Sequence, residues 1–422
     1  MRVVCSPNPN TINPTEGVSF SLLNSTGIPG VGRVGANLPS AVLRSGIKAE
    51  PKAWDFLAFA LAVVAADHGC IRSKSADGWT REIELHVSVV DHSLWQQQAT
   101  HLESTLKFLT GDIWDITFHD GGIRPPRRQR RSRLSRPSGD VVCLLSGGVD
   151  SLVGAIDLIG NNKHPVLVSQ VSKGDSDRQR RFARSIGSSL SHIQLSHAAN
   201  PPGTAERSQR ARSIMFLALG LLAATSLPEH RAGNSIDLVM PENGFISLNV
   251  PLTPLRVGSL STRTTHPFFL SQIQTIWNVV GFNVQLNNPY QFKTKGEMLS
   301  ECIDQQTLQN FVFQSTSCGR FGRYGYQHCG RCVPCIVRRA AFLHWGKTDQ
   351  TQYKYDNPVS EKEFDDIRSI AMAALSVYRD GVQKWAGANI SYAQLGNVDP
   401  YYDIASRGIS ELSTFLRQAG AM

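Results

Sequence analysis

The spacing of hydrophobic positions divides the chain into regions of different character. Residues 53–66 form an almost continuous apolar run, AWDFLAFALAVVAA, which predicts a buried helix. Strand-like patterns cover residues 81–90 and 113–118, and residues 101–109 have the spacing of an amphipathic helix. These elements predict a small α+β domain over residues 1–122.

The pattern after residue 140 alternates between strands and helices. The predicted strands are 141–145, 165–171 and 236–240, and the predicted helices are 152–160, 178–186 and 214–224. Such alternation is typical of an α/β fold with a doubly wound parallel sheet, which we expect over residues 140–350. Helical spacing at 361–385 and 404–416 predicts a helical C-terminal region over residues 351–422.

Charge is concentrated in one short segment. The chain has 422 residues and a formal net charge of +9, which alone would point to nucleic acid. Seven arginines lie in the run RPPRRQRRSRLSR at residues 124–136, so the rest of the chain carries only +2. Like charges and prolines predict an extended linker over residues 123–139, and contact with nucleic acid or an acidic partner is the alternative.

Export and membrane insertion are not expected. The first residues, MRVVCSPNPN, lack the features of a secretory signal. The apolar run at 53–66 is shorter than the roughly 20 residues that cross a bilayer. Eight cysteines are too few for a disulfide scaffold in a chain of this size. We therefore expect a cytoplasmic protein without a membrane span.

A glycine loop joins the first strand and helix of the second domain. Its sequence, SGGVDS at residues 146–151, places backbone N–H groups at the positive end of a helix, which suits a phosphate or pyrophosphate. Asp150 is a candidate for orienting the loop or holding Mg²⁺, and an ordinary turn is the alternative. The loop lacks the Gly-Lys-Ser/Thr ending that serves γ-phosphate transfer. The candidate nucleotide-binding residues are Ser146, Gly147, Gly148, Val149, Asp150 and Ser151.

Four cysteines have the spacing of a metal site. Cys318, Cys329, Cys332 and Cys335 form a C-x10-C-x2-C-x2-C arrangement, and four thiolates at this spacing can surround Zn²⁺. A site with all four positions filled leaves no place for water, so we expect a structural role. Disulfides and an iron–sulfur cluster are the alternatives.

The loop resembles the SGGxDS signature of the PP-loop ATP pyrophosphatases, and the cysteine segment resembles a second motif. Residues 329–338, CGRCVPCIVR, match the C-G-x-C-x-x-C-x-x-R pattern of the 7-cyano-7-deazaguanine synthase (QueC) family. Residues 212–217, RSIMFL, resemble that family's R-N-x-x-F-L segment with serine in place of asparagine. The resemblance covers residues 140 to 345. Residues 169–174, SQVSKG, depart from the family's Asp-Tyr-Gly-Gln-like run.

This resemblance implies a fold, an activity and a set of cofactors. The fold is a PP-loop, adenine nucleotide α-hydrolase-like sheet with a zinc-binding insertion. The activity is ATP-dependent ligation of carbon and nitrogen, in which 7-carboxy-7-deazaguanine, a deazapurine small molecule, is adenylated with release of pyrophosphate and AMP. The cofactors are ATP, Mg²⁺ and Zn²⁺, and the catalytic residues are Asp150, Ser151 and Arg212.

The chain as a whole resembles the QatC-type, QueC-like proteins of the Qat anti-phage defence system. That resemblance implies a protein partner in the same system, whose amine is the alternative to ammonia as the nucleophile. Two other functions stay open. One is modification of tRNA by another PP-loop branch, with the arginine run binding phosphates. The other is a catalytically inactive scaffold that senses a nucleotide.

Three further residues are candidates for binding the substrate. Glu242 follows the strand that ends at residue 240, where open α/β sheets present ligand groups, although a turn at 243–244 competes. Arg263 and His266 lie in the run STRTTHP, which suits a polar or anionic ligand and proton transfer near neutral pH. A polar loop that satisfies its own backbone is the alternative. Lys293 and Lys295 are candidates for neutralising phosphate charge, against the commoner case of solvated surface lysines.

Overall fold

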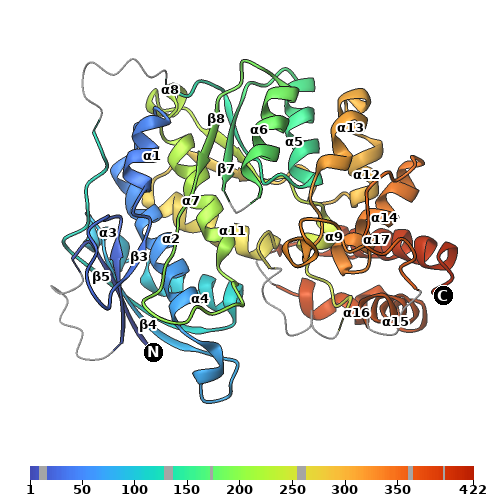
Figure 1. Cartoon of the computed structure of the whole chain (residues 1–422), viewed down its shortest axis with the longest axis horizontal. Helices are drawn as coiled ribbons and strands as arrows, with labels where there is room; N and C mark the ends of the chain where they lie inside the picture. The colour runs from blue at the N-terminus through green and yellow to red at the C-terminus, as the bar shows by residue number, and fades with distance from the viewer. Residues whose placement is uncertain (9–16, 128–135, 172–173, 254–262, 360–364, 393–394) are drawn as a thin grey trace.

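The computed structural model describes residues 1–8, 17–127, 136–171, 174–253, 263–359, 365–392 and 395–422. Within these ranges the chain forms two five-stranded sheets in which every neighbouring pair of strands is parallel. Figure 1 places the first sheet at one end of the molecule, the second sheet near the middle and the C-terminal helices at the opposite end. The predicted α/β class is therefore confirmed.

The first sheet has the strand order β3-β2-β1-β4-β5. Its strands are β1 (Arg2–Ser6), β2 (Val18–Leu22), β3 (Gly32–Val34), β4 (Glu82–Ser88) and β5 (Ile113–His119). Its helices are α1 (Leu38–Arg44), α2 (Pro51–Gly69), η2 (Arg72–Lys74), α3 (His92–Gln96) and α4 (Ala99–Thr110). The parallel pairing makes this unit α/β rather than the expected α+β, because β1 to β3 are short strands in a Pro- and Asn-rich stretch whose pattern did not predict them.

The second sheet has the order β10-β9-β6-β7-β8 and confirms the predicted doubly wound arrangement. Its strands are β6 (Val141–Leu144), β7 (Pro165–Gln170), β8 (His192–Leu195), β9 (Ile236–Val239) and β10 (Val284–Asn287). Its helices are α5 (Val149–Gly160), α6 (Ser176–Ile186), α7 (Arg212–Ala224), α8 (Pro228–Arg231), α9 (Gly244–Ser247) and α11 (Pro267–Val280).

The strand order places a crevice beside β6. From β6 the chain builds β7 and β8 on one side and then crosses to β9 and β10 on the other. In such sheets ligands bind outside the carboxyl ends of the strands at this reversal, the topological switch point. The loop 146–151 follows β6 and Glu242 follows β9, so both candidate segments lie at the switch point.

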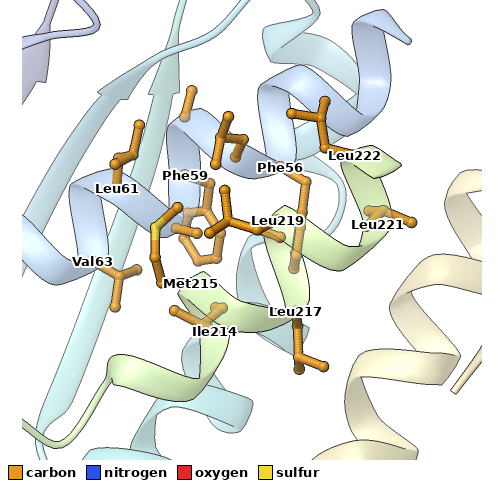
Figure 2. Packing of buried hydrophobic residues seen from close by; sticks show 14 of the residues in the cluster. Phe56, Phe59, Leu61, Val63, Ile214, Met215, Leu217, Leu219, Leu221 and Leu222 are labelled. Atoms are coloured by element: carbon orange, nitrogen blue, oxygen red, sulfur yellow. The ribbon is translucent and has the colours of Figure 1, made fainter. Parts of the chain in front are cut away.

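Two helices from distant parts of the sequence form the centre of the molecule. Most of α2 is buried, and it packs along α7 in one hydrophobic core that also includes strands of both sheets. Figure 2 shows Phe56 and Phe59 of α2 against Met215 and Leu219 of α7. A helix that is apolar on all sides requires partners all around it. The apolar run that predicted a buried helix is therefore explained by a position between the two sheets.

The remaining helices follow the second sheet along the chain. They are α12 (Lys295–Ser300), α13 (Gln305–Phe311), η3 (Val312–Gln314), η4 (Phe321–Tyr324), α14 (Val333–Trp345), α15 (Asp365–Asp380), α16 (Val382–Ile390) and α17 (Asp399–Gln418). Gly381, with φ +84°, separates α15 from α16 inside the stretch expected to be one helix. The predicted helical C-terminal region is confirmed. Across the described ranges, no helix has both the length and the apolar character that a membrane span requires.

Candidate active site

The SGGVDS loop forms a tight turn between β6 and α5. Gly147 has φ +89°, a conformation that favours glycine over residues with a side chain. The Ser146 and Ser151 hydroxyls lie 3.1 Å apart, and the backbone N–H of Gly148 donates to the Ser146 hydroxyl over 3.2 Å. The loop therefore holds its own shape, and it lies beside the first turn of a 12-residue helix, where the helix dipole favours an anion.

Asp150, the fifth residue of the SGGVDS loop, is buried and forms an ion pair with a lysine that lies far along the chain. Its carboxylate accepts hydrogen bonds from the backbone N–H and the side-chain amide of Asn243, at 3.1 and 2.8 Å. The other carboxylate oxygen forms an ion pair with the Lys295 ammonium, and both side chains are about nine-tenths buried. Burial alone would raise the pKa of Asp150. The Lys295 charge and the hydrogen bonds outweigh it and hold that pKa well below its ordinary value.

Lys295 owes its position to the start of α12. Thr294 and Glu297 form a reciprocal capping box around it, which fixes the first turn of the helix. Two residues of α17 hold this box, because Glu411 accepts a hydrogen bond from Thr294 and Arg407 pairs with Glu297. The sequence makes Lys295 a candidate for neutralising phosphate charge, but it does not distinguish this residue from the commoner surface lysine. In the sequence, only the capping-box pattern T-x-x-E at residues 294–297 indicates that Lys295 has an ordered position.

A cavity of about 530 Å³ opens in front of the loop. Asp150, Glu242 and Lys295 line it together with the loop serines, and the Glu242 carboxylate accepts a hydrogen bond from Asn243 over 3.1 Å. Two carboxylates and one ammonium therefore face the same space at the switch point. This donor set suits a pyrophosphate with a divalent cation.

The four cysteines converge on one point beside this cavity. Their sulfur atoms all lie within 4.8 Å of one another and all four residues are buried. Two of the sulfur pairs, Cys329–Cys335 and Cys318–Cys332, are 3.9 and 3.8 Å apart. A tetrahedral ion about 2.3 Å from each sulfur separates them by about 3.8 Å, so the geometry fits Zn²⁺. None of these cysteines forms a disulfide.

The four-cysteine cluster is connected to the loop through Arg338. This buried guanidinium donates to the Ser315 and Ser317 hydroxyls over 2.9 and 3.2 Å. Between those serines, the backbone N–H of Thr316 donates to the carbonyl of Gly147 over 3.0 Å. The arginine that ends the C-x-x-C-x-x-R pattern therefore holds the segment on which the loop rests. The motif identifies this arginine in the sequence, but it does not identify the hydrogen-bond partners of its guanidinium.

The other predicted site residues lie in different places. Arg212 and Ser213 begin α7 and line a second cavity beside the loop. Arg263 lies 4.7 Å above the Phe108 ring, and His266 is buried, where it accepts a hydrogen bond from the backbone N–H of Phe268. Neither lines the two cavities by the loop. Burial lowers the pKa of His266 to about 4, with the Asn389 carbonyl opposing that shift and the charge of Arg263 adding to it, so its imidazole is neutral at pH 7.

The arginine run is only partly described. Residues 128–135 and Ser261–Thr262 lie outside the described residues. Of the run, Arg124, Arg127 and Arg136 are described, and they line a hollow that contains no residue of the SGGVDS loop. Nothing in these positions tests contact with nucleic acid.

Comparison with known proteins gives one partial similarity. No protein-family model matches the chain. The 7-cyano-7-deazaguanine synthase 1 of Mesorhizobium japonicum is 36% identical over 92 residues. The matched stretch is 21% of this chain and 37% of that protein, so it spans little more than a third of the relative's length. Over that stretch the chain is similar to a QueC-type synthase, in agreement with the parallel sheet and the four-cysteine cluster.

Proposed function

We propose that the chain is an ATP-dependent enzyme of the QueC type that adenylates a carboxylate and releases pyrophosphate. The proposal rests on one observation above all: Asp150, Lys295 and Glu242 line a single cavity in front of the SGGVDS loop at the switch point. The partial similarity to a 7-cyano-7-deazaguanine synthase supports the same class. The proposed substrate is a 7-deazapurine carboxylate, 7-carboxy-7-deazaguanine, and the later product is AMP.

The residues of the first cavity fit ATP and Mg²⁺. The loop backbone and the start of α5 would hold the pyrophosphate part of ATP, and Asp150 and Glu242 would hold the cation. When bound, Mg²⁺ neutralises charge on the phosphate oxygens as a Lewis acid. Lys295 contributes a fixed positive charge in the same cavity, and Ser146 and Ser151 keep the loop in shape. Catalysis then comes from positioning and charge neutralisation.

The acyl-adenylate needs a nitrogen nucleophile. We propose ammonia for nitrile synthesis, or the amine of a partner protein if the chain acts in anti-phage defence. The regions outside the second sheet support the second route, because the first sheet and the C-terminal helices offer additional surface to a partner protein.

Pyrophosphate release tests the proposal directly. The purified chain, incubated with ATP, Mg²⁺, ammonia and 7-carboxy-7-deazaguanine, is expected to release pyrophosphate and AMP. Asp150→Asn should lower that rate at least about 100-fold, because it removes a carboxylate that would hold the cation beside the phosphates. Asp177→Asn, on the exposed side of α6, is the matched control and should keep the wild-type rate. Absence of any pyrophosphate release by the wild-type chain would contradict the proposal.

A further inference from the structure

A second cavity, of about 490 Å³, also lies beside the SGGVDS loop. It shares Ser146, Ser151 and Glu242 with the first cavity, so the two spaces meet at the loop. The second cavity contains neither Asp150 nor Lys295. Its walls come from the start of α7, the end of β9 and residues 264–265. The chemistry proposed above assigns no ligand to it.

The start of α7 gives this cavity the character of an oxyanion site. Arg212 and Ser213 are the first two residues of the 13-residue helix, and both line the cavity. Ser213 is 5% exposed, and its hydroxyl has no hydrogen-bond partner within the described part of the chain. A buried hydroxyl without a partner is costly, and a bound acceptor atom removes that cost. The helix dipole and the Arg212 guanidinium favour the same negative charge.

The first sheet's unit holds this helix start in place. The Asp67 carboxylate, at the end of α2, accepts hydrogen bonds from the backbone N–H groups of Arg210 and Ala211 over 2.7 and 3.0 Å. Its other oxygen accepts one from the Arg81 guanidinium over 2.7 Å. The Arg210 guanidinium donates to the Thr110 carbonyl over 2.8 Å. The segment that leads into Arg212 is therefore rigid before any ligand binds, which limits the ordering cost of binding.

The remaining walls suit a flat ring. Phe216 and Met240 form an apolar surface, and Gln209, Thr264 and Thr265 add hydrogen-bonding groups. An aromatic side chain prefers to stack on or meet the edge of another ring, and a methionine sulfur packs well against one. A planar heteroaromatic acid matches this combination of an apolar wall, polar edges and a cationic end.

The two cavities have complementary places in a displacement at phosphorus. The attacking and leaving oxygens of such a reaction lie roughly in line, on opposite sides of the phosphorus atom. The first cavity suits the leaving pyrophosphate, because it holds Lys295 and the acidic pair Asp150 and Glu242. The second cavity adjoins the first at Ser146 and Ser151, so it is the neighbouring space available to the attacking group.

We propose that the second cavity is the subsite for the carboxylate of the acceptor, held by Arg212 and Ser213. One carboxylate oxygen forms a bond to the α-phosphorus of ATP, and the bond from that phosphorus to its bridging oxygen breaks. The bridging oxygen leaves with the electron pair as part of pyrophosphate, and no proton is transferred. This assignment rests on the proposed adenylation. It specifies where the second substrate of that reaction, the carboxylic acid, binds.

Equilibrium binding by calorimetry separates the two substrates. The probes are 7-carboxy-7-deazaguanine alone and the Mg²⁺ complex of α,β-methylene-ATP alone. Ser213→Ala should weaken binding of the acid about tenfold, the worth of one hydrogen bond to a charged group. Arg212→Lys should weaken it by a similar factor and Arg212→Ala by about 100-fold. Binding of the nucleotide should change by less than about twofold in all three variants.

The matched control is Ser226→Ala. Ser226 follows the end of the same helix, is 2% exposed and also has a hydroxyl without a partner within the described chain, but it lines neither cavity. It should bind both probes as the wild type does, and thermal denaturation confirms that each variant is folded.

Three results would overturn the assignment. Weaker nucleotide binding with unchanged acid binding would identify the oxyanion as a phosphate of ATP. Unchanged acid binding in Arg212→Ala would place the acid elsewhere, and so would a wild-type chain that binds the nucleotide but no acid. A wild-type chain that fails to bind the nucleotide contradicts the proposed function itself, which is a distinguishable outcome.

Discussion

Asp150 and Lys295 stabilise each other in a position that neither could occupy alone. Replacing Lys295 with methionine leaves the Asp150 carboxylate buried without its countercharge, which costs about 3–5 kcal/mol of unfolding free energy. The replacement also raises the pKa of Asp150, since the Lys295 charge is a main cause of its lowering. Urea denaturation should therefore show a loss that is largest at neutral pH and smaller near pH 4, where the unpaired carboxyl takes up a proton.

Lys293 provides the control for this prediction. It is two residues earlier, and its ion pair with Glu301 is exposed, with the two side chains 39% and 52% accessible. Lys293→Met should cost less than about 1 kcal/mol at either pH, as exposed pairs do. Equal losses from both lysine variants would contradict the buried pair.

Residues of the site differ in how far the sequence reveals them. Loop residues and cysteines are recognisable because their ligand geometry comes from short spacings within one segment. Lys295 lies 145 residues from Asp150, so no local pattern could show that the two meet. Arg263 and His266 share a dense polar run, yet the fold directs them toward Phe108 and Asn389. Density of polar residues in sequence does not indicate which cavity they face.

Among the elements, α14 transmits the geometry of the cysteine cluster to the glycine loop. Arg338→Met would remove hydrogen bonds to Ser315, Ser317, Thr351 and the Val312 carbonyl from a fully buried position. We expect a loss of about 3–5 kcal/mol in unfolding free energy and weaker binding of Mg²⁺-ATP, because the support of Gly147 is lost.

The neighbouring Arg339 serves as the control for α14. Its guanidinium reaches two carbonyl groups of a surface segment, at Tyr355 and Asp356, and does not contact the loop support. Arg339→Met should leave nucleotide binding at the wild-type level. If Arg338→Met binds the nucleotide as tightly as Arg339→Met, α14 does not position the loop.

Strands of the second sheet were predictable to different degrees for a physical reason. β6 and β7 are buried along their whole length and therefore read as continuous apolar runs. β8 and β10 are four residues long and partly exposed, so their sequences do not differ clearly from a loop. β1 to β3 are three to five residues long and flank a Pro- and Asn-rich stretch, which left the parallel order of the first sheet unpredicted.

At the scale of the whole molecule, the two sheets depend on one core. Phe59 of α2 packs in the same cluster as Leu219 of α7 and strands from both sheets. Phe59→Ala should lower the unfolding free energy by about 3–5 kcal/mol and should shift the unfolding of both sheets together. Hydrogen exchange read separately for β4 and β7 provides the measurement, and loss of protection in β4 alone would contradict a shared core.

This dependence could not be seen in the sequence, which presents 1–122 and 140–350 as separate patterns with a charged segment between them. The division into those domains stays a prediction. The apolar run of α2 shows that this helix needs packing partners on all sides, but it does not identify α7 as one of them.

The shared core also sets an order of events during synthesis. The last residue of α2 leaves the ribosome about 155 residues before the last residue of α7. At roughly 5–20 residues per second, that interval lasts about 8–30 seconds. Throughout it, an almost wholly apolar helix has been made while its principal partner has not. During that interval only the first sheet can cover α2, and the face that packs on α7 stays without its partner.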